Sequence, residues 1–227
     1  MSKYKVFITI KEKSERVKKK NFIKFKKNIP MFKLLLYKLN KFNLFVDTDS
    51  NKIINSIKND KKLSHVKVYA RKKKFIQMEN KNLSPGPYMI KNFLENFVED
   101  KNEPIIHAHV TSPFLKQETL TDALKYMYKG YDSVTSCNLI NKITFIKNKK
   151  KIKPINFKFN RQHQKTQNLK SLVIINSAFF IFKKINFLKR LQRISKNNYF
   201  YEINFPEYID IDNDEDVLIS KLSKKFL

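Results

Sequence analysis

Val6-Phe7-Ile8-Thr9-Ile10 is a short run of β-branched and aromatic residues near the start of the chain, and it predicts a buried strand. A basic loop follows at residues 11–20, and a helix is expected at 32–39. A second apolar run at 43–46 predicts the next strand, and residues 51–58 the next helix. This alternation of short strands and helices is typical of an α/β fold with a mostly parallel sheet.

The same alternation continues toward the C-terminus. Strands are expected at 66–69, 104–110, 133–137 and 172–182, and helices at 89–98 and 120–127. Residues 139–171 interrupt the rhythm, because they are basic and contain only short candidate strands. We interpret this segment as a β-rich insertion within a single domain of residues 1–227. Such an insertion often contacts a second subunit, which favours a homodimer, whereas a solvated loop is the alternative.

The chain is strongly basic, with 48 Lys and Arg residues against 20 Asp and Glu residues and a formal net charge of +28. A charge of this size normally suggests nucleic-acid binding. However, the lysines are spread along the whole chain, and abundant Lys, Asn, Ile and Phe with no Trp is the bias that an AT-rich genome imposes. We therefore attribute the charge to composition and do not expect a nucleic-acid partner. The positive field would still attract an anionic substrate.

Cysteine content and hydropathy indicate the expected compartment. The single cysteine, Cys137, excludes an internal disulfide. No apolar run approaches the roughly 18 residues of a membrane-spanning helix, so no membrane partner is expected. The segment Met1–Val6 reads as the start of a strand rather than as a signal peptide. We therefore expect a cytoplasmic protein.

An acidic stretch, Ile209-Asp210-Ile211-Asp212-Asn213-Asp214-Glu215-Asp216, stands out in this basic chain. Asp210 and Asp212 alternate with apolar residues, and a spacing of two points both carboxylates to one side of an extended segment. Two such ligands suit Mg²⁺ when phosphate oxygens complete its coordination. The alternative is a helix start, with Asn213 as N-cap and three acids in the first turn. The cap explains residues 213–216, which leaves Asp210 and Asp212 as candidate metal ligands.

Four further polar clusters follow predicted strands, where ligands bind in open α/β sheets. They are the loop Lys11–Asn21, the triplet Asp47–Asp49, Arg71, and the segment His107–Ser112. The loop is rich in hydrogen-bond donors but contains no glycine, so lysine side chains would replace some backbone contacts of a phosphate loop. A solvated basic loop is the alternative.

The other clusters are less specific by themselves. Asp47-Thr48-Asp49 resembles the metal-binding Asp-x-Asp of nucleotide-sugar glycosyltransferases, but such a triplet is more often a turn in which Asp49 caps the next helix. His107 and His109 share one face of a strand, and without a third ligand nearby they are weak evidence for zinc. His109, with Thr111 and Ser112, has the donors to bind a polar substrate.

Taken together and in order, these segments resemble the acylneuraminate cytidylyltransferases, or CMP-sialic acid synthetases, over about residues 4–223. That family begins with a strand followed by Arg-x-x-Ser-Lys-Gly-(Ile/Leu)-Pro-x-Lys-Asn, and Ser14, Lys20 and Asn21 match within Lys11–Asn21, where Lys11 replaces the arginine. Later family motifs correspond to Asp47–Asp49, Arg71-Lys72, His109–Pro113, Asn176–Phe180, Tyr199-Phe200 and Asp210-Ile211-Asp212.

The resemblance implies a three-layer Rossmann-like nucleotidyltransferase fold, with a mostly parallel sheet and a small inserted dimerisation arm. It implies that CTP and an acidic nine-carbon sugar of the sialic type react with Mg²⁺ to give a CMP-sugar and pyrophosphate. The implied catalytic residues are Lys20, Asp210 and Asp212, and the two aspartates are the implied metal ligands. The implied nucleotide-binding residues are Lys11, Ser14, Lys20, Asn21 and Arg71, and the implied sugar-binding residues are His109, Thr111, Phe180, Tyr199 and Phe200.

Three alternative functions remain open at this point. The first is CTP-dependent activation of another acidic sugar, such as an octulosonic acid. The second is a glycosyltransferase that uses the Asp47–Asp49 triplet, although the chain is short for an acceptor region and Asp210-Ile211-Asp212 would then be unexplained. The third is a catalytically decayed basic protein that binds RNA.

Overall fold

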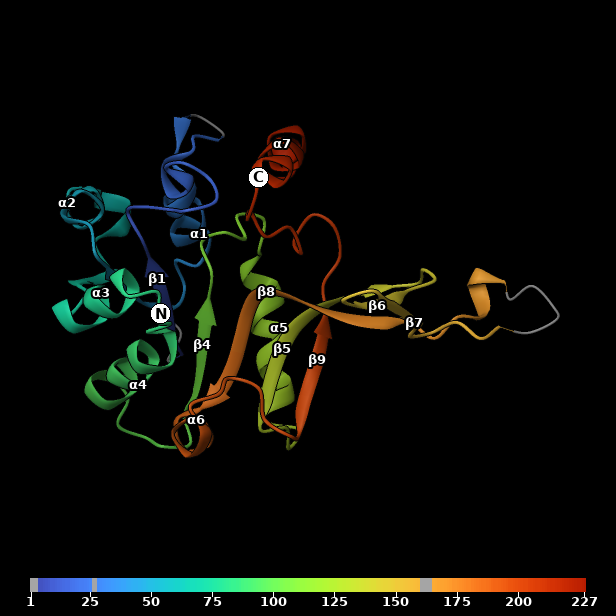
Figure 1. Cartoon of the computed structure of the whole chain (residues 1–227). Helices are drawn as coiled ribbons and strands as arrows, with labels where there is room; N and C mark the ends of the chain where they lie inside the picture. Colours follow the sequence, from blue (N-terminus) through green and yellow to red (C-terminus); the bar gives the residue numbers. More distant parts are fainter. Residues whose placement is uncertain (1–3, 26–27, 160–164) are drawn as a thin grey trace.

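A seven-stranded sheet forms the centre of the computed structural model, which describes residues 4–25, 28–159 and 165–227 (Figure 1). Within these residues the strand order is β3-β2-β1-β4-β8-β5-β9. The strands are β1 (Lys5–Ile10), β2 (Asn43–Thr48), β3 (Lys67–Ala70), β4 (Pro104–Ala108), β5 (Ser133–Ile140), β8 (Leu172–Lys183) and β9 (Asn198–Glu202). Of these, β8 runs antiparallel to both neighbours, and the remaining pairs are parallel. The prediction of a mostly parallel sheet is confirmed.

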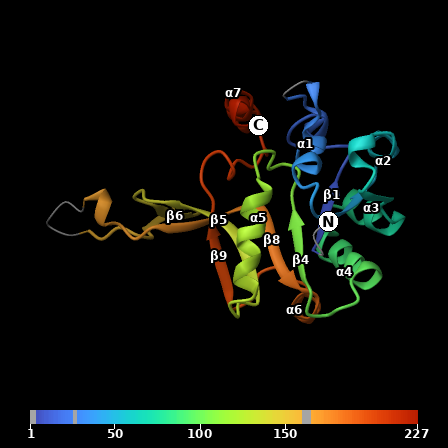
Figure 2. The same cartoon turned by 180° about the vertical axis from the view of Figure 1, so that it is seen from behind.

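Helices cover both faces of the sheet and complete three layers. The clusters of buried residues assign α1 (Met31–Lys38), α2 (Asn51–Lys58) and α5 (Gln117–Met127) to one face, and α3 (Lys73–Asn80), α4 (Gly86–Phe97) and α6 (Lys184–Arg190) to the other. Helix α5 lies behind the sheet in Figure 1 and in front of it in Figure 2. Shorter 3-10 helices span Lys20–Phe22, Lys61–Leu63, Thr166–Asn168 and Ser223–Phe226.

The first strand shows why the sheet is covered on both sides. Successive strand side chains point to opposite faces, so Val6 and Ile8 pack in the core under α1, α2 and α5, whereas Phe7 packs under α4. The Phe7 ring stacks on that of Phe93 from α4, with ring centroids 4.5 Å apart. Apolar residues on both faces therefore make β1 a buried central strand, as its near-continuous hydrophobic sequence predicts.

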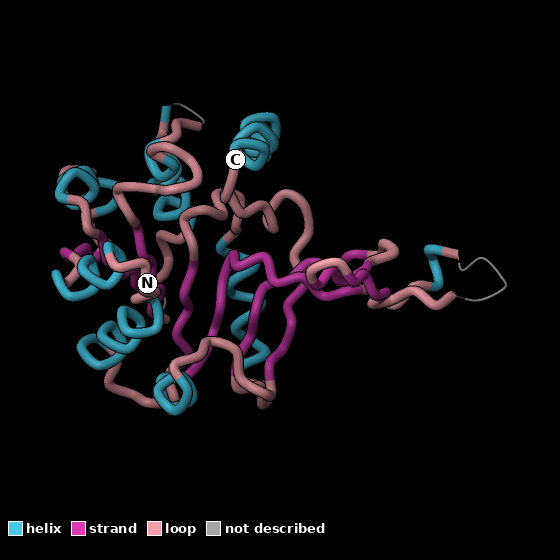
Figure 3. The backbone as a smooth tube through the Cα atoms, in the orientation of Figure 1, coloured by secondary structure: helices cyan, strands magenta, loops and turns pink. Residues whose placement is uncertain are grey.

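Residues 139–171 form a β-rich arm in the described part of the segment. Strands β5 and β8 continue beyond the main sheet, and β6 (Phe145–Asn148) pairs with β7 (Lys151–Pro154) in a separate antiparallel hairpin. Figure 3 shows this arm extending away from the body of the molecule. Residues 160–164 of the predicted insertion lie outside the described residues. The described part of the segment is β-rich, since it contains the hairpin of β6 and β7.

The acidic stretch leads into the last helix, α7 (Asp214–Leu222). Asn213 is its N-cap and forms a capping box with Asp216, since the Asn213 side chain accepts from the Asp216 N–H and the Asp216 carboxylate accepts from the Asn213 N–H. The prediction that Asn213 caps a helix with three acids in its first turn is therefore confirmed. Ile209 and Ile211 are buried with Met31, which anchors the segment to the body of the protein. No helix in the described ranges is long and apolar enough to cross a membrane.

Candidate active site

A pocket of about 750 Å³ lies at the carboxyl ends of β1 and β4. The chain proceeds from β1 to β2 and β3 on one side and places β4 on the other, so this is the point where the strand order reverses. Ligands of open α/β sheets bind at such a point. The pocket is lined, among others, by these predicted site residues: Lys11, Ser14, Lys20, Asn21, Arg71, His109, Thr111, Asp210 and Asp212.

Lys20 connects the basic loop to the acidic segment. Its Nζ atom donates to the carbonyl oxygen of Ile211 at 2.7 Å and lies 3.0 Å from Oδ1 of Asp212. Arg16 reaches the same carboxylate oxygen at 2.8 Å. The Lys20 side chain is only 11% exposed, so its charge is held at a defined place on the pocket wall. Two cations therefore share one carboxylate oxygen on the pocket wall.

The remaining loop residues hold the loop in shape. Asn21 donates from Nδ2 to the carbonyl oxygen of Lys11 at 2.7 Å and so ties the two ends of the loop together. The Nζ atom of Lys11 lies 3.2 Å from a carboxylate oxygen of Glu79 on α3. Lys19, just before the buried pair Lys20 and Asn21, has a positive φ of 54°. The turn that a phosphate loop usually builds with glycine is made here by a lysine in the left-handed region.

Arg71 lines the pocket, but its guanidinium is engaged by protein groups. Its side chain is fully buried, Nε lies 2.7 Å from Oδ1 of Asp47, and Nη1 lies 3.1 Å from Glu79. Nη2 donates to the carbonyl oxygen of Ile10 at 3.3 Å. These bonds join the ends of β1 and β2 to α3. The geometry gives Arg71 a structural role at the base of the pocket.

The Asp47–Asp49 triplet does not form an open metal site. Asp47 is buried against Arg71, and burial raises the pKa of its carboxyl group despite that cation. Asp49 accepts a hydrogen bond from the backbone N–H of Glu12 at 2.8 Å. The N-cap of α2 is Ser50, whose hydroxyl accepts from the Ile53 N–H, so the prediction of Asp49 as the cap is wrong.

Asp210 and Asp212 both face the pocket and fit a hard cation. Oδ1 of Asp210 is buried and has no hydrogen-bond partner among the described residues. Burial raises the pKa of Asp210, a hydrogen bond from Thr111 opposes this, and the charge of Asp212 raises it further. A buried carboxylate with an unused oxygen is a suitable cation ligand. In the described part of the chain no group of three or more acidic, His or Cys side chains is arranged for a metal, so substrate oxygens would have to complete the coordination.

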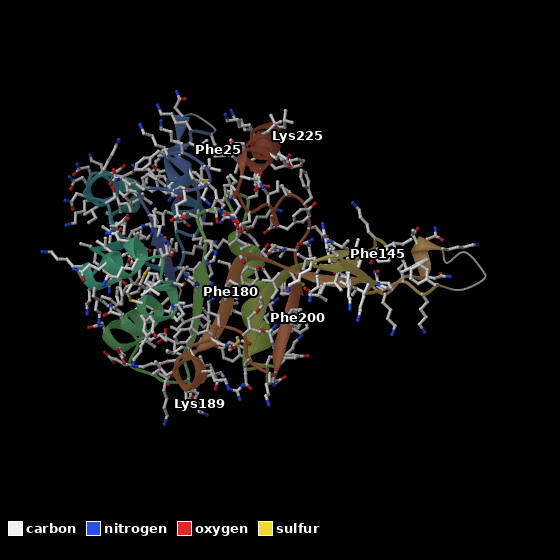
Figure 4. All side chains as sticks on the ribbon, viewed as in Figure 1. Phe25, Phe145, Phe180, Lys189, Phe200 and Lys225 are labelled. Atoms are coloured by element: carbon white, nitrogen blue, oxygen red, sulfur yellow. The ribbon has the colours of Figure 1, made fainter. Side chains whose placement is uncertain are left out.

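A second pocket of about 600 Å³ adjoins the first. Residues that line both pockets are Thr9, Ser84, Gly86, His109 and Ser177. The second pocket is more aromatic and is lined by His107, Phe180, Phe187, Gln192 and Arg193 as well. Figure 4 labels Phe180 on β8, in the middle of the sheet. Ser177 on the shared wall has a φ of 59°, so backbone in the left-handed region shapes the junction of the two pockets.

Arg193 is the residue of the second pocket that the sequence did not reveal. Its guanidinium carbon lies 3.7 Å from the centroid of the Phe180 ring. Its Nη1 atom lies 3.0 Å from Nδ1 of His107 and 3.2 Å from Nε2 of His109. Burial, together with the neighbouring positive charge of Arg193, lowers the pKa of His109 to about 3. Both imidazoles are therefore neutral at neutral pH, since the pKa of His107 is also lowered well below its usual value.

Tyr199 and Phe200 lie away from both pockets. They are on β9, which is the edge strand of the sheet and pairs in parallel with β5. The register places Val134 beside Tyr199 and Thr135 beside Phe200. The Tyr199 ring stacks on Tyr126 of α5 at 3.7 Å, and Phe200 is 45% exposed (Figure 4). The structure does not bring these two residues to the other candidates, so we do not retain them in the site.

Comparisons with known proteins agree with this architecture. A family model described as cytidylyltransferase matches residues 7–223. Among solved structures, the chain is similar to CMP:2-keto-3-deoxy-manno-octonic acid synthetase complexed with CTP, with a TM-score of 0.67, 12% identity and full coverage of both chains. It is also similar to a 4-diphosphocytidyl-2C-methyl-D-erythritol synthase from Anaerococcus prevotii, with a TM-score of 0.62, 10% identity, and coverage of 98% of this chain and 96% of that one.

A third similar structure belongs to a larger protein. It is the bifunctional IspDF from Campylobacter jejuni, with a TM-score of 0.63 and 14% identity over 96% of this chain and 54% of that one. No curated protein sequence matches the chain. At these identities the structural likeness concerns the fold alone, and it confirms the expected three-layer nucleotidyltransferase architecture.

Proposed function

Because this chain belongs to the cytidylyltransferase family, we propose that it transfers the CMP group of CTP to an acidic keto sugar and releases pyrophosphate. The observation that carries the proposal is the joining of two pockets at His109 and Ser177, one with lysines and carboxylates and the other with an arginine and aromatic rings. The acidic sugar is a nine-carbon nonulosonic acid of the sialic type or an eight-carbon octulosonic acid. Both carry a carboxylate and a reactive anomeric hydroxyl, so the two pockets suit either.

The first pocket is the proposed nucleotide site. Lys11 and Lys20 would bind the triphosphate, and fixed positive charge near a reacting phosphate stabilises the negative charge that builds up during transfer. Ser14 and Asn21 would contact the nucleotide from the same loop. Arg71 would act indirectly, by holding the strand ends against α3.

The second pocket would hold the sugar. His109 lies where the two pockets meet, Thr111 lines the first pocket, and Phe180 offers an apolar wall in the second. Holding the sugar hydroxyl next to the α-phosphate supplies much of the rate gain expected for such a transfer, because positioning replaces a bimolecular encounter.

Asp210 and Asp212 are the proposed ligands of Mg²⁺. When bound, this ion would neutralise charge on the α-phosphate and favour the ionised form of the attacking hydroxyl. The buried, unpartnered Oδ1 of Asp210 supports the assignment. Asp212 would exchange contacts with Arg16 and Lys20 for contacts with the cation. The Asp47–Asp49 triplet of the glycosyltransferase alternative is less suited to a metal, since Arg71 already occupies Asp47.

The arm at residues 139–171 is the proposed interface with a second copy of this chain. Ile146 and Ile152 are exposed on the two strands of its hairpin, and Val173 is exposed at the adjoining start of β8. Exposed apolar residues grouped on a projecting element are typical of interaction sites. A homodimer built through the arm would remove these side chains from water.

The proposed reaction is tested by pyrophosphate release from the purified protein. The protein is mixed with Mg²⁺, one of the four ribonucleoside triphosphates, and either N-acetylneuraminic acid or 3-deoxy-manno-octulosonic acid. We expect release with CTP and one of the acids, and its loss when EDTA is added. Release with another triphosphate in preference to CTP, or no release from folded protein with a wider panel of acidic keto sugars, would contradict the proposal.

A further inference from the structure

Arg193 is a largely buried cation that has no acidic partner among the residues that the structure describes. In the described part of the chain no carboxylate forms an ion pair with it, and both of its hydrogen bonds there use Nη1. The contrast with Arg71 is direct, since Arg71 is buried against both Asp47 and Glu79. Removing a charge from water is costly unless an opposite charge compensates it.

The groups around Arg193 orient its guanidinium without neutralising its charge. Arginine has only donors, so Nη1 must donate to Nδ1 of His107 and to Nε2 of His109. Both imidazoles are then neutral acceptors, and the Phe180 ring packs against the flat face of the guanidinium. Three neutral side chains thus hold one positive charge in a fixed plane. The low pKa values of the two histidines agree with this arrangement.

The rest of the guanidinium lies at the second pocket. Arg193 lines that pocket together with Gln192 and Ile194, and Nε and Nη2 have no hydrogen-bond partner among the described residues. A planar guanidinium with its edge donors available binds a carboxylate through two parallel hydrogen bonds. His107 also lines this pocket, and its Nε2 has no hydrogen-bond partner among the described residues. A carboxylate in the pocket would satisfy the available donors of Arg193.

We infer that Arg193 binds the carboxylate of the sugar and selects acidic over neutral sugars, with His107 and His109 as the residues that position it. The inference rests on the proposed function for the identity of the substrate. In this assignment the two anionic groups, the triphosphate of CTP and the carboxylate of the sugar, bind in different pockets. The lysine-rich first pocket takes the triphosphate, and Arg193 in the second pocket takes the carboxylate. It also places the sugar next to His109, where the two pockets join.

The test compares Arg193→Met with Arg193→Lys and with the matched control Arg190→Met. Arg190 is exposed on α6 and does not line either pocket. We expect Arg193→Met to raise the KM for the acid about 100-fold, as for loss of charged hydrogen bonds, with the KM for CTP changed less than twofold. Arg193→Lys should recover part of the affinity, and Arg190→Met should behave as wild type. Wild-type preference for the acid over its neutral carboxamide should shrink in Arg193→Met.

The outcomes separate this inference from the proposed function. If the wild type releases pyrophosphate but Arg193→Met keeps its KM for the acid and its preference over the carboxamide, the inference is wrong and the proposed function stands. If neither the wild type nor any variant releases pyrophosphate, calorimetry measures the binding of each acid to the wild type and to Arg193→Met. Binding by wild type that is lost in Arg193→Met supports the arginine site, whereas equal binding or no binding by folded wild type overturns it. Thermal melting of each variant identifies a loss that is only due to unfolding.

Discussion

The Nζ atom of Lys20 lies 3.0 Å from Oδ1 of Asp212, although 192 residues separate the two along the chain. The contact joins the loop after the first strand to the segment before the last helix. Lys20 also donates to the carbonyl oxygen of Ile211, so the amine remains anchored when the carboxylate is engaged elsewhere. This pair therefore connects the proposed triphosphate site to the proposed metal site.

Asp212→Asn tests the metal site with a nearly isosteric change. We expect turnover to fall by about 100-fold or more, because the amide cannot replace a charged metal ligand. The melting temperature should change little, since Asp212 is 36% exposed and Lys20 keeps its bond to Ile211. Asp214→Asn, on an exposed residue of the first turn of α7, is the control. Collapse of the fold in Asp212→Asn would instead assign the residue a structural role.

Lys20→Met tests the triphosphate site. The variant should raise the KM for CTP by about tenfold or more while changing the KM for the sugar much less, because the lost charge faces the nucleotide pocket. Steady-state kinetics with each substrate varied in turn measures the two constants. Lys18→Met is the control, since Lys18 is exposed in the same loop. Equal weakening of both substrates would count against the assignment.

Arg71→Met tests whether this arginine is structural. Removing it leaves Asp47 buried without its ion-pair partner, and breaking a buried pair typically costs about 3–5 kcal/mol. Urea unfolding should show a loss of this size, and the double variant Arg71→Met with Asp47→Asn should recover part of it. A stable Arg71→Met protein with a raised KM for CTP would instead indicate that Arg71 binds the nucleotide directly.

Acid sensitivity should follow from the buried histidines. The pKa of His109 is about 3 in the folded protein and near 6.5 in an unfolded chain, so between these values the unfolded state binds more protons. Stability should therefore fall as the pH is lowered through this window, by up to about 1.4 kcal/mol per pH unit for this proton. Urea unfolding of wild type and His109→Gln at pH 5 and pH 7 should show a smaller loss in the variant. Identical losses would contradict the low pKa of His109.

From the exposed apolar residues of the arm we predict a dimer that is stabilised by apolar contacts. Light scattering at micromolar concentration should give the mass of two chains for the wild type. The double variant Ile146→Asp with Ile152→Asp should be a monomer, because both side chains are exposed on the hairpin. Lys189→Asp, a charge change on an exposed residue of α6 outside the arm, should remain a dimer. A monomeric wild type would defeat the prediction.

Much of the fold follows from local patterns in the sequence. The helix at 51–58 coincides with α2, and the strand expected at 172–182 is β8 with one further residue. These segments have strong hydrophobic periodicity, which determines the face that each element buries. The capping box at Asn213 and Asp216 was also readable, since caps depend on residues three apart in the sequence.

The missed elements have weak local signals. Helix α3 begins in a run of lysines that reads as a solvated segment, and it is held mainly by one buried side chain, Phe75. Helix α6 follows β8 without a loop to mark its start. Sequence patterns favour elements with a continuous apolar stripe, so short helices docked by a single residue escape them.

Site residues that follow predicted strands could be predicted from the sequence. Residues whose role depends on side-chain contacts with distant parts of the chain could not. Asp210 and Asp212 follow from position and charge, whereas Lys20 was singled out by the family resemblance. The contact of Arg71 with Glu79 was not predicted, because Glu79 lies on α3, a helix that was not expected. Arg193 comes two residues after Leu191, which is in the left-handed conformation at the end of α6, and nothing in its neighbours along the chain indicates that it turns toward His107 and His109 at the end of β4.

The measurement that tests the central claim most directly is ³¹P NMR of the reaction product. The protein is incubated with Mg²⁺, CTP and the acidic sugar that supports pyrophosphate release. We predict one new phosphodiester resonance, from a single phosphate that joins cytidine to the sugar, in equal amount to the released pyrophosphate. A product with two linked phosphates between cytidine and its partner, or hydrolysis of CTP without any sugar-linked phosphorus, would contradict CMP transfer to an acidic sugar.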